Sequence, residues 1–244
     1  SSTAPAPVPA PAGPSPTPAA SPETTAPAGA RQARGGSQAG EAAPKPYDQV
    51  ITAEAVSRPG LFTVHRVGPK LFFEIPGNQL GKDQLLVTEI ARTVLGSGYG
   101  GQAVGNRVLR WELRDHKVFL RTVSYEAVAD PDAPEYQAVL AANVPPIVEA
   151  FNVEAYGPDS AAVIDVTELF TQPPQELGPG TRIPGNVDAS RSWIDRATPF
   201  PDNVNVYATL TFAQQAGAAR AGAATNTCLL YTSDAADEED SVDL

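Results

Sequence analysis

The chain has no methionine, one cysteine and two histidines among its 244 residues. A single cysteine, Cys228, excludes an internal disulfide and a cysteine-rich zinc site. No apolar run approaches the roughly 18 residues that a membrane-spanning helix needs. Because methionine is missing even at position 1, we interpret the chain as an internal part of a longer polypeptide, or as one whose start has been removed.

Basic residues are few: 17 Lys and Arg stand against 28 Asp and Glu, which gives a formal net charge of −11. Six of the acidic residues and no basic ones lie from Cys228 onward, so the rest of the chain carries a net charge of only −5. Nucleic-acid binding requires a dense basic patch, and the sequence has no such stretch. We therefore expect no nucleic-acid partner and no transmembrane segment.

Large apolar side chains are almost absent from residues 1–46, which consist mainly of Pro, Ala, Ser, Thr and Gly. Such a segment cannot bury enough apolar surface to offset the entropy lost on ordering, so we predict a disordered, Pro/Ala-rich linker. One interpretation is a flexible spacer that follows an export signal, and the other is an ordinary disordered terminus. The sequence itself contains no recognisable signal peptide.

The C-terminal residues lack hydrophobic periodicity. After an Ala/Gly-rich stretch, residues 228–238 read CLLYTSDAADE, which matches the translation of a transposase sequencing adapter. We interpret residues 228–244 as an adapter artefact within an unstructured segment, 213–244. The natural protein is then expected to continue differently after about Thr227. The alternative interpretation is an acidic interaction tail.

The clearest structural signal is RVLRWELRDHKVFLRTVSY, residues 107–125, in which apolar and polar residues alternate on both sides of a polar gap at 114–117. This pattern predicts a β-hairpin. The register that aligns the apolar faces pairs Leu113 with Val118, Trp111 with Leu120, and Leu109 with Thr122. The opposite face is mixed, so we expect it to be partly covered.

Further strands are predicted at residues 61–67, 71–75, 147–156, 161–166 and 203–212, with a short strand or turn at 47–51. Residues 83–95 are long enough for a helix, but their Val and Thr content favours a strand. Short helices are predicted at 134–142, 168–170 and 190–196. Asp132 is expected to cap the first of these helices, and Asp165 or Thr167 the second.

This count of elements indicates an α+β fold that is rich in β-structure, with twisted, mostly antiparallel sheets, hairpins and a few short helices. We expect a small N-terminal β domain at residues 47–95. A second β-rich domain, truncated on its C-terminal side, is expected at residues 96–212.

A glycine-rich segment at residues 96–101 satisfies the spacing G-x-G-x-x-G. A nucleotide-binding loop of this kind must open a helix, whereas β-type residues follow here, so a turning connection is the better interpretation. The two histidines are His65, in a predicted strand, and His116, at the hairpin tip. They lack the i, i+4 spacing of a helix-borne zinc site, and we expect two ordinary histidines.

The carboxylates form two groups in the sequence. Asp130, Asp132 and Glu135 lie among prolines and indicate a solvated turn, while Asp165 and Glu168 fit a helix start. Paired carboxylates can perform acid–base chemistry, but closeness in sequence does not fix their separation in space. No G-x-S-x-G nucleophile elbow occurs. We therefore assign no catalytic, cofactor-binding or metal-binding residue.

Ten short segments between residues 46 and 212 together form a recognisable pattern. They are YDQVIT (47–52), GLFTVH (60–65), FEIP (73–76), GKD (81–83), LLV (85–87), GYGG (98–101), RWE (110–112), SY (124–125), IDVTELF (164–170) and RSWI (191–194). This pattern resembles the N-terminal region of a family of bacterial zinc-dependent metalloproteases. In that family the region forms two adjoining domains of unknown function, ahead of a catalytic domain bearing H-E-x-x-H.

The resemblance implies an exported parent, periplasmic, outer-membrane-associated or extracellular, that uses zinc to hydrolyse a peptide or protein substrate. The missing C-terminal catalytic domain would be the partner of this chain in cis. None of the family's zinc ligands, nor its catalytic Glu, corresponds to a residue here, so we predict an inactive fragment without a cofactor. The alternative is a secreted, β-rich binding module with no enzymatic parent.

Overall fold

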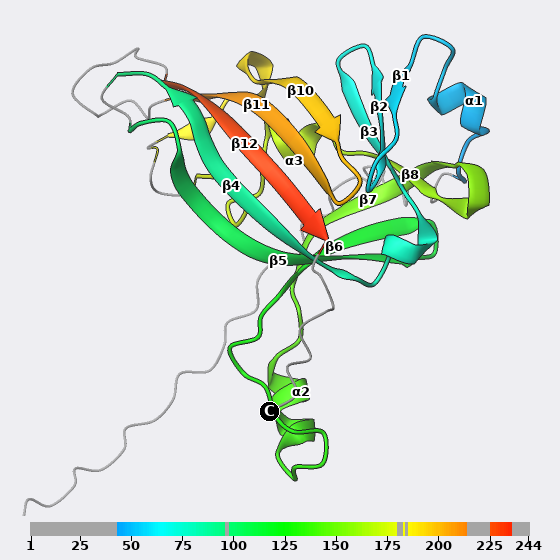
Figure 1. Ribbon diagram of the computed structural model, residues 1–244, viewed down its shortest axis with the longest axis vertical. Coiled ribbons are helices and arrows are strands. Elements are labelled where there is room, and N and C mark those ends of the chain that lie inside the picture. The colour runs from blue at the N-terminus through cyan, green and yellow to red at the C-terminus, as the bar shows by residue number, and fades with distance from the viewer. Residues whose placement is uncertain (1–42, 96–97, 180–182, 184, 214–224, 236–244) are drawn as a thin grey trace, which may run out of the picture. The chain divides into compact units, whose positions relative to one another are not determined.

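A computed structural model describes residues 43–95, 98–179, 183, 185–213 and 225–235. One open antiparallel sheet dominates it (Figure 1). The described strands are β1 (Val56–Arg58), β2 (Thr63–Val67), β3 (Lys70–Ile75), β4 (Asp83–Thr93), β5 (Gln102–Arg114), β6 (Lys117–Val123), β7 (Ile147–Tyr156), β8 (Ala162–Asp165), β9 (Asn186–Val187), β10 (Trp193–Pro199), β11 (Asn203–Ala213) and β12 (Thr225–Ala235). Their order is β1-β2-β3-β8-β7-β6-β5-β4-β12-β11-β10, and β9 pairs with β11.

Helices are short and few in the described residues. They are α1 (Tyr47–Val50), α2 (Tyr136–Ala142), α3 (Thr167–Thr171) and the 3-10 turns η1 (Gly77–Gln79), η2 (Pro158–Ser160) and η4 (Ala189–Arg191). The predicted β-rich α+β fold with antiparallel hairpins is thereby confirmed. None of the helices in the described ranges has the length and apolar character needed to span a membrane.

The predicted hairpin is present as β5 and β6. Its register pairs Leu113 with Val118, Trp111 with Leu120, and Leu109 with Thr122, as the alternation predicts. Asp115 and His116 have φ angles of 48° and 62° and form the two-residue turn, a turn geometry that suits the right-handed twist of the flanking strands. The opposite face of both strands is largely half-buried, which confirms that it is partly covered.

Aromatic rings fill the centre of the core. Phe62 contacts both Phe73 and Trp111, with ring centroids 5.5 and 6.2 Å apart, and Trp111 also contacts Phe151 at 5.8 Å. Phe170, on α3, extends this cluster to Phe73 at 5.8 Å. The core therefore joins strands from both predicted domains to α3.

The sheet curls until its two ends approach each other. Arg66 on β2 donates from Nη2 to the carbonyl of Ile194 on β10 over 3.0 Å. Nearby, Leu61 N donates to the Phe200 carbonyl over 2.7 Å. Gly60 has no room for a side chain, because a Cβ there would lie 2.6 Å from that of Pro199. We call the junction between β1–β2 and β10 the seam.

Residues 47–95 and 96–212 do not form separate sheets. β3 pairs with β8 and β4 pairs with β5, so strands from the first range pair directly with strands from the second. The predicted division into two domains therefore corresponds to one interleaved sheet with a shared core.

Several local predictions are wrong. Residues 47–50 form a helical turn, α1, so the strand alternative predicted there is wrong. The helix predicted at 190–196 is instead η4 followed by β10, because Ile194 is buried and the segment pairs with the edge of β11. Asp132 does not cap α2, because the N-cap residue is Glu135 and no side chain caps the helix there; Asp132 lies in the preceding turn, where its backbone N–H donates to Asp130 Oδ1 at 2.9 Å.

Other predictions are confirmed. Residues 83–93 form a strand, β4, as their β-branched content favours. Asp165 Oδ1 accepts hydrogen bonds from the Thr167 backbone N–H and hydroxyl at 3.0 and 2.5 Å, so this carboxylate caps the start of α3. The strands predicted at 147–156 and 203–212 are β7 and β11.

The prediction that residues 213–244 are unstructured is wrong for residues 225–235, which form β12. Strand pairing explains this: β4 and β11 offer backbone groups that a strand can pair, and Leu229 and Tyr231 are buried against the core. Residues 1–42 of the predicted linker and residues 236–244 lie outside the described residues. Within the linker, Lys45 N donates to the Glu154 carbonyl over 2.7 Å.

Candidate functional site

His65 is the centre of a buried polar cluster on the first three strands. Its ring is 2% exposed, with Nδ1 2.7 Å from the Ser57 hydroxyl on β1 and Nε2 3.0 Å from Glu74 Oε2 on β3. The Tyr47 hydroxyl on α1 donates to the same Glu74 oxygen over 2.7 Å. The cluster therefore attaches α1 to the outer face of the sheet.

The order of these bonds fixes the tautomer of His65. A carboxylate can only accept, so Nε2 carries a proton toward Glu74, and in the neutral ring Nδ1 accepts from Ser57. Burial, and then the hydrogen bond to Glu74, raise the pKa of Tyr47 to about 12. Gly157 is required beside this site, because a Cβ there would lie 2.7 Å from the Glu74 carboxyl carbon.

The sequence Ser–His–Glu has the bonding order of a nucleophile–base–carboxylate relay. Ser57, however, lies on the edge strand β1, whose three residues are all exposed, and it lines none of the cavities described below. Both ring nitrogens of His65 are already bonded. This geometry describes a bridge that holds α1 and three strands together.

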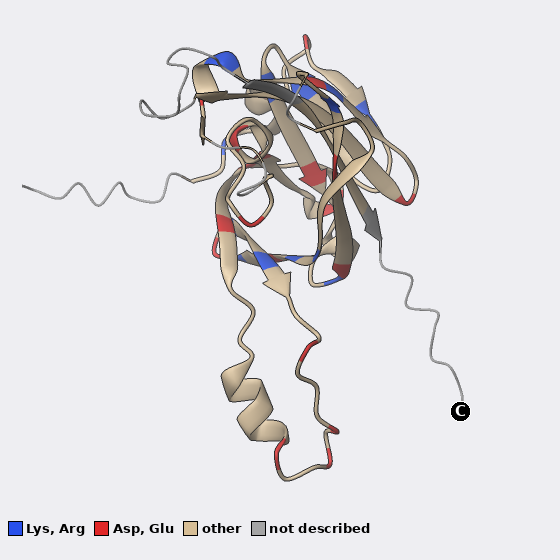
Figure 2. Ribbon diagram, turned by 90° about the vertical axis from the view of Figure 1, so that its left-hand side faces the viewer, with Lys and Arg blue, Asp and Glu red and all other residues tan. Residues whose placement is uncertain are grey.

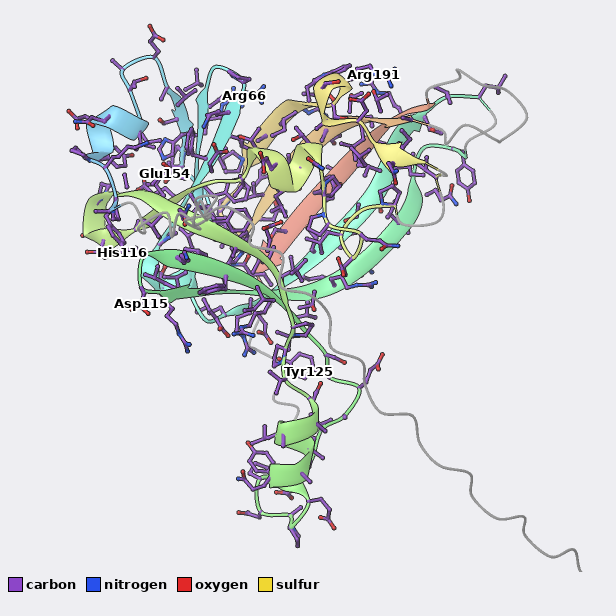
Figure 3. The ribbon with its side chains drawn as sticks, turned by 180° about the vertical axis from the view of Figure 1, so that it is seen from behind. Arg66, Asp115, His116, Tyr125, Glu154 and Arg191 are labelled. Carbon is purple, nitrogen blue, oxygen red and sulfur yellow. The ribbon has the colours of Figure 1, made fainter. Side chains whose placement is uncertain are left out.

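His116 is held apart from this cluster, at the tip of the β5–β6 hairpin. Its Nδ1 lies 2.9 Å from the Tyr156 hydroxyl, and the two rings meet edge to face with centroids 5.7 Å apart. Figure 3 shows His116 and Asp115 together at this turn. Within the described ranges, no three His, Cys, Asp or Glu side chains are arranged to hold a metal ion.

The carboxylates singled out by sequence fall in two places. Asp165 and Glu168 line a cavity of about 330 Å³ with Glu149 and Glu154. Lys70 Nζ bonds Asp165 over 2.9 Å at its rim, and this bond raises the pKa of Lys70. Asp165 is thus occupied by its helix cap and by Lys70.

The other group, Asp130, Asp132 and Glu135, lies on a projection between β6 and β7. We call residues 124–146 the arm, and Figure 1 shows it leaving the sheet with α2 near its far end. Figure 2 shows Asp and Glu along it and no Lys or Arg. Its four acidic residues, Glu126 included, give it a negative charge.

The base of the arm is fixed to the sheet. Arg121 donates from Nη1 to the Pro145 carbonyl over 2.6 Å, and Asn143 Nδ2 donates to the carbonyls of Ser124 and Ala127 at 3.2 and 3.3 Å. Tyr125, labelled at the base in Figure 3, donates its hydroxyl to Asp83 on β4. That hydrogen bond raises the pKa of Tyr125.

The arm exposes apolar side chains, some of them next to its base. Val128 is 76% exposed, Val144 68% and Leu140 49%. No residue from 124 to 146 is buried. A projection with a fixed base and exposed apolar side chains is a candidate interaction element.

The seam contains a second cavity, of about 300 Å³. Its walls combine apolar side chains with three arginines and one aspartate: Val56, Val64, Leu71, Ala197, Arg58, Arg66, Arg196 and Asp195. The Arg196 guanidinium lies over the Tyr207 ring at 3.8 Å, and Arg66 is fixed by the carbonyls of Gly68 and Ile194. Such a site suits a small ligand with an anionic group and an apolar part.

The glycine-rich segment does not bind nucleotide in the manner of a helix-opening loop, since it leads into β5 rather than a helix. Gly98 and Gly101 have φ angles of 115° and 82°, which only glycine adopts without strain. Gly101 N donates to the Ile90 carbonyl over 2.8 Å. The predicted turning connection is confirmed for its described part.

A β-rich, interleaved domain with a projecting arm is thus the class of protein that the geometry defines. Residues 101–233, more than half of the chain, match the family described as a domain of unknown function, DUF5117, and the chain belongs to that family. Residues 44–93 match a second domain of unknown function, DUF5118. No curated protein and no solved structure matches the chain.

Proposed function

We propose that this chain is the non-catalytic N-terminal portion of an exported bacterial zinc-dependent metalloprotease, and that the arm docks it to the catalytic domain in cis. The observation that carries the docking role is the exposed apolar surface of the arm on a fixed base. The ten segments that resemble the metalloprotease family support the parentage. Two adjoining domains of unknown function are what that resemblance implies, and two are found.

The residues described here do not fit a zinc site, because His65 uses both ring nitrogens and His116 bonds Tyr156. We therefore assign no metal step to this chain. In the parent, two histidines of the H-E-x-x-H helix would hold zinc, and the Glu would activate a water for peptide hydrolysis.

Location follows from the same proposal. The Pro/Ala-rich residues 1–46 suit a spacer between an export signal or envelope anchor and the folded domain. We place the parent in the periplasm, at the outer membrane or outside the cell.

We also propose that residues from Cys228 onward are encoded by a sequencing adapter. The support is the match of residues 228–238 to the adapter translation. In the natural protein a different sequence would then follow about Thr227.

Proteolysis by the full gene product, compared with this chain, tests the function. We expect chelator-sensitive cleavage of a protein substrate by the full product and none by the chain alone. In the full product, replacing Val128 and Leu140 with Ser should weaken docking and reduce activity, while the same change at the exposed Val56 should not. Chelator-sensitive cleavage by the chain itself would contradict the proposal.

The seam cavity favours a second candidate function, that of a secreted binding module without an enzymatic parent. Its three arginines and apolar walls are the specific observation. A downstream reading frame that holds a stop codon or another β module would favour this alternative, whereas an H-E-x-x-H motif would favour the first.

A further inference from the structure

β12 fills the groove between β4 and β11 along its whole length. Its register runs from Thr225 opposite Phe212 to Asp234 opposite Asn203, and it pairs with β4 from Thr227 to Ala235. The backbone ladder is therefore well formed. The side chains fit the groove less well.

Four of the five buried side-chain atoms without a hydrogen-bond partner in the described residues gather at this strand. They are Gln84 Nε2 on β4, Asn203 Oδ1 and Asn205 Oδ1 on β11, and the Tyr231 hydroxyl on β12. Native proteins pair nearly all such atoms. The side chains of β12 therefore leave polar atoms of the groove without a hydrogen-bond partner.

On the inner face, the Tyr231 ring packs against the core, but its hydroxyl has no hydrogen-bond partner. The ring packs against Phe170 with centroids 5.2 Å apart, while burial raises the pKa of Tyr231. In the adjacent inward position, the Ser233 hydroxyl donates to Gln84 Oε1 at 3.1 Å, an oxygen that already accepts from Trp111 Nε1 at 3.2 Å. The amide nitrogen of Gln84 still needs an acceptor.

On the outer face, the unpaired atoms are two amide oxygens, which need hydrogen-bond donors. Asn205 lies in register with Thr232, and Asn203 with Asp234. Neither asparagine oxygen receives a hydrogen bond. A longer side chain with an N–H group in the Thr232 register would reach the Asn205 oxygen.

We propose that the β4–β11 groove is a binding site for the segment that follows β11 in the natural polypeptide, and that this segment differs chemically from β12. It carries an apolar side chain without a hydroxyl in the Tyr231 register. It carries an oxygen acceptor, such as Asn or Asp, in the Ser233 register, and an N–H donor in the Thr232 register. This inference rests on the proposal that residues from Cys228 onward are foreign.

The occupant lies in cis because of the connection. β12 pairs antiparallel with β11, with Thr225 opposite Phe212, so the strand that follows β11 in the sequence is also its neighbour in the sheet. We therefore assign the groove to the strand that follows β11 in the natural polypeptide.

The first test uses the full chain with Tyr231→Phe. Removal of an unpaired buried hydroxyl should raise the thermal unfolding midpoint. The matched control, Tyr47→Phe, removes a hydroxyl that bonds Glu74, and it should lower the midpoint. A lower midpoint for Tyr231→Phe would overturn the inference.

The second test uses the full chain with a protease site introduced between residues 213 and 225. After cleavage, native mass spectrometry measures which of two equimolar peptides replaces β12. One peptide has the β12 sequence, and the other carries Phe, Asn and Lys in the Tyr231, Ser233 and Thr232 registers. We expect the second to be preferred about tenfold. A third peptide, with proline in the Leu230 register, should not bind because it breaks the ladder.

Equal or reversed preference between the first two peptides would overturn the inference. If cleavage unfolds the chain, the thermal unfolding midpoint of Tyr231→Phe alone tests the inference. The intact chain could also form a dimer in solution that dissociates when the second peptide is added. That result would show that the groove takes a strand from a second copy, and it would contradict the cis assignment. Neither test involves proteolytic activity, so failure here is distinguishable from failure of the metalloprotease proposal.

Discussion

At the scale of single residues, Trp111 and Trp193 show how position in the sheet determines the burial of a side chain. Trp111 is 3% exposed and contacts two aromatic rings, while Trp193, on the edge strand β10, is 50% exposed. Both indoles donate to a side chain, Trp111 to Gln84 and Trp193 to Asp195. The difference between them is therefore burial and packing rather than hydrogen bonding.

Trp111→Ala should lower the free energy of unfolding by about 3–5 kcal/mol, because it removes a ring from the centre of the core. The matched control Trp193→Ala should cost about 1 kcal/mol or less, because the site is open to solvent. Chemical denaturation of both variants measures the two values. A cost under about 1 kcal/mol for Trp111→Ala would show that the faces of the hairpin are wrongly assigned.

Tyr47 gives the cluster around His65 a predictable dependence on pH. Its pKa is raised to about 12, above its ordinary value of 10.0, so the folded state favours the neutral phenol. The stabilisation is fully present below about pH 10 and is lost as the pH rises toward 12. The destabilisation caused by Tyr47→Phe should therefore be largest near neutral pH and should shrink above pH 10.

Unfolding midpoints of the two proteins at pH 7 and pH 11 test this. Folding also raises the pKa of Tyr231, so the comparison is made in a Tyr231→Phe background. A difference between the proteins that stays constant from pH 7 to pH 11 would contradict the role given to the Tyr47–Glu74 hydrogen bond.

At the scale of elements, the arm combines low burial with a fixed base. Its far part is exposed, while its base is fixed through Arg121 and Asn143. Few buried apolar contacts predict low local stability. Docking would then add the contacts that the arm lacks by itself.

Asn143→Ala should loosen the arm without unfolding the sheet. It removes two hydrogen bonds to the carbonyls of Ser124 and Ala127, both at the exposed base. Amide hydrogen exchange across residues 124–146 should become faster, with the exchange of β5 and β6 unchanged. Unaltered exchange in the arm would show that these bonds do not hold it.

Sequence alternation predicts the elements whose two faces differ, and the β5–β6 hairpin follows it residue by residue. It fails at β10 and β12, because edge pairing with β11 decides those segments rather than local pattern. The His65 cluster and the seam cavity are built from residues on separate strands, so no local spacing reveals them. The arm leaves a weak signal, acidic residues and prolines around exposed apolar side chains.

At the scale of the whole molecule, the two families of unknown function are one structural unit. Strands of residues 44–93 are inserted into the sheet of residues 101–233, with β4 paired on both sides by strands of the second region. Each region therefore supplies strands that pair with strands of the other. We infer that they act together as a single platform, which suits a module that supports a catalytic domain.

The natural gene tests the account most directly. Sequencing the source locus through the end of the reading frame should show a sequence that departs from this chain after about Thr227. It should then encode a strand with an apolar, hydroxyl-free residue facing Phe170, followed by a domain that contains H-E-x-x-H. A locus that encodes the same residues 228–244 and then stops would contradict the account.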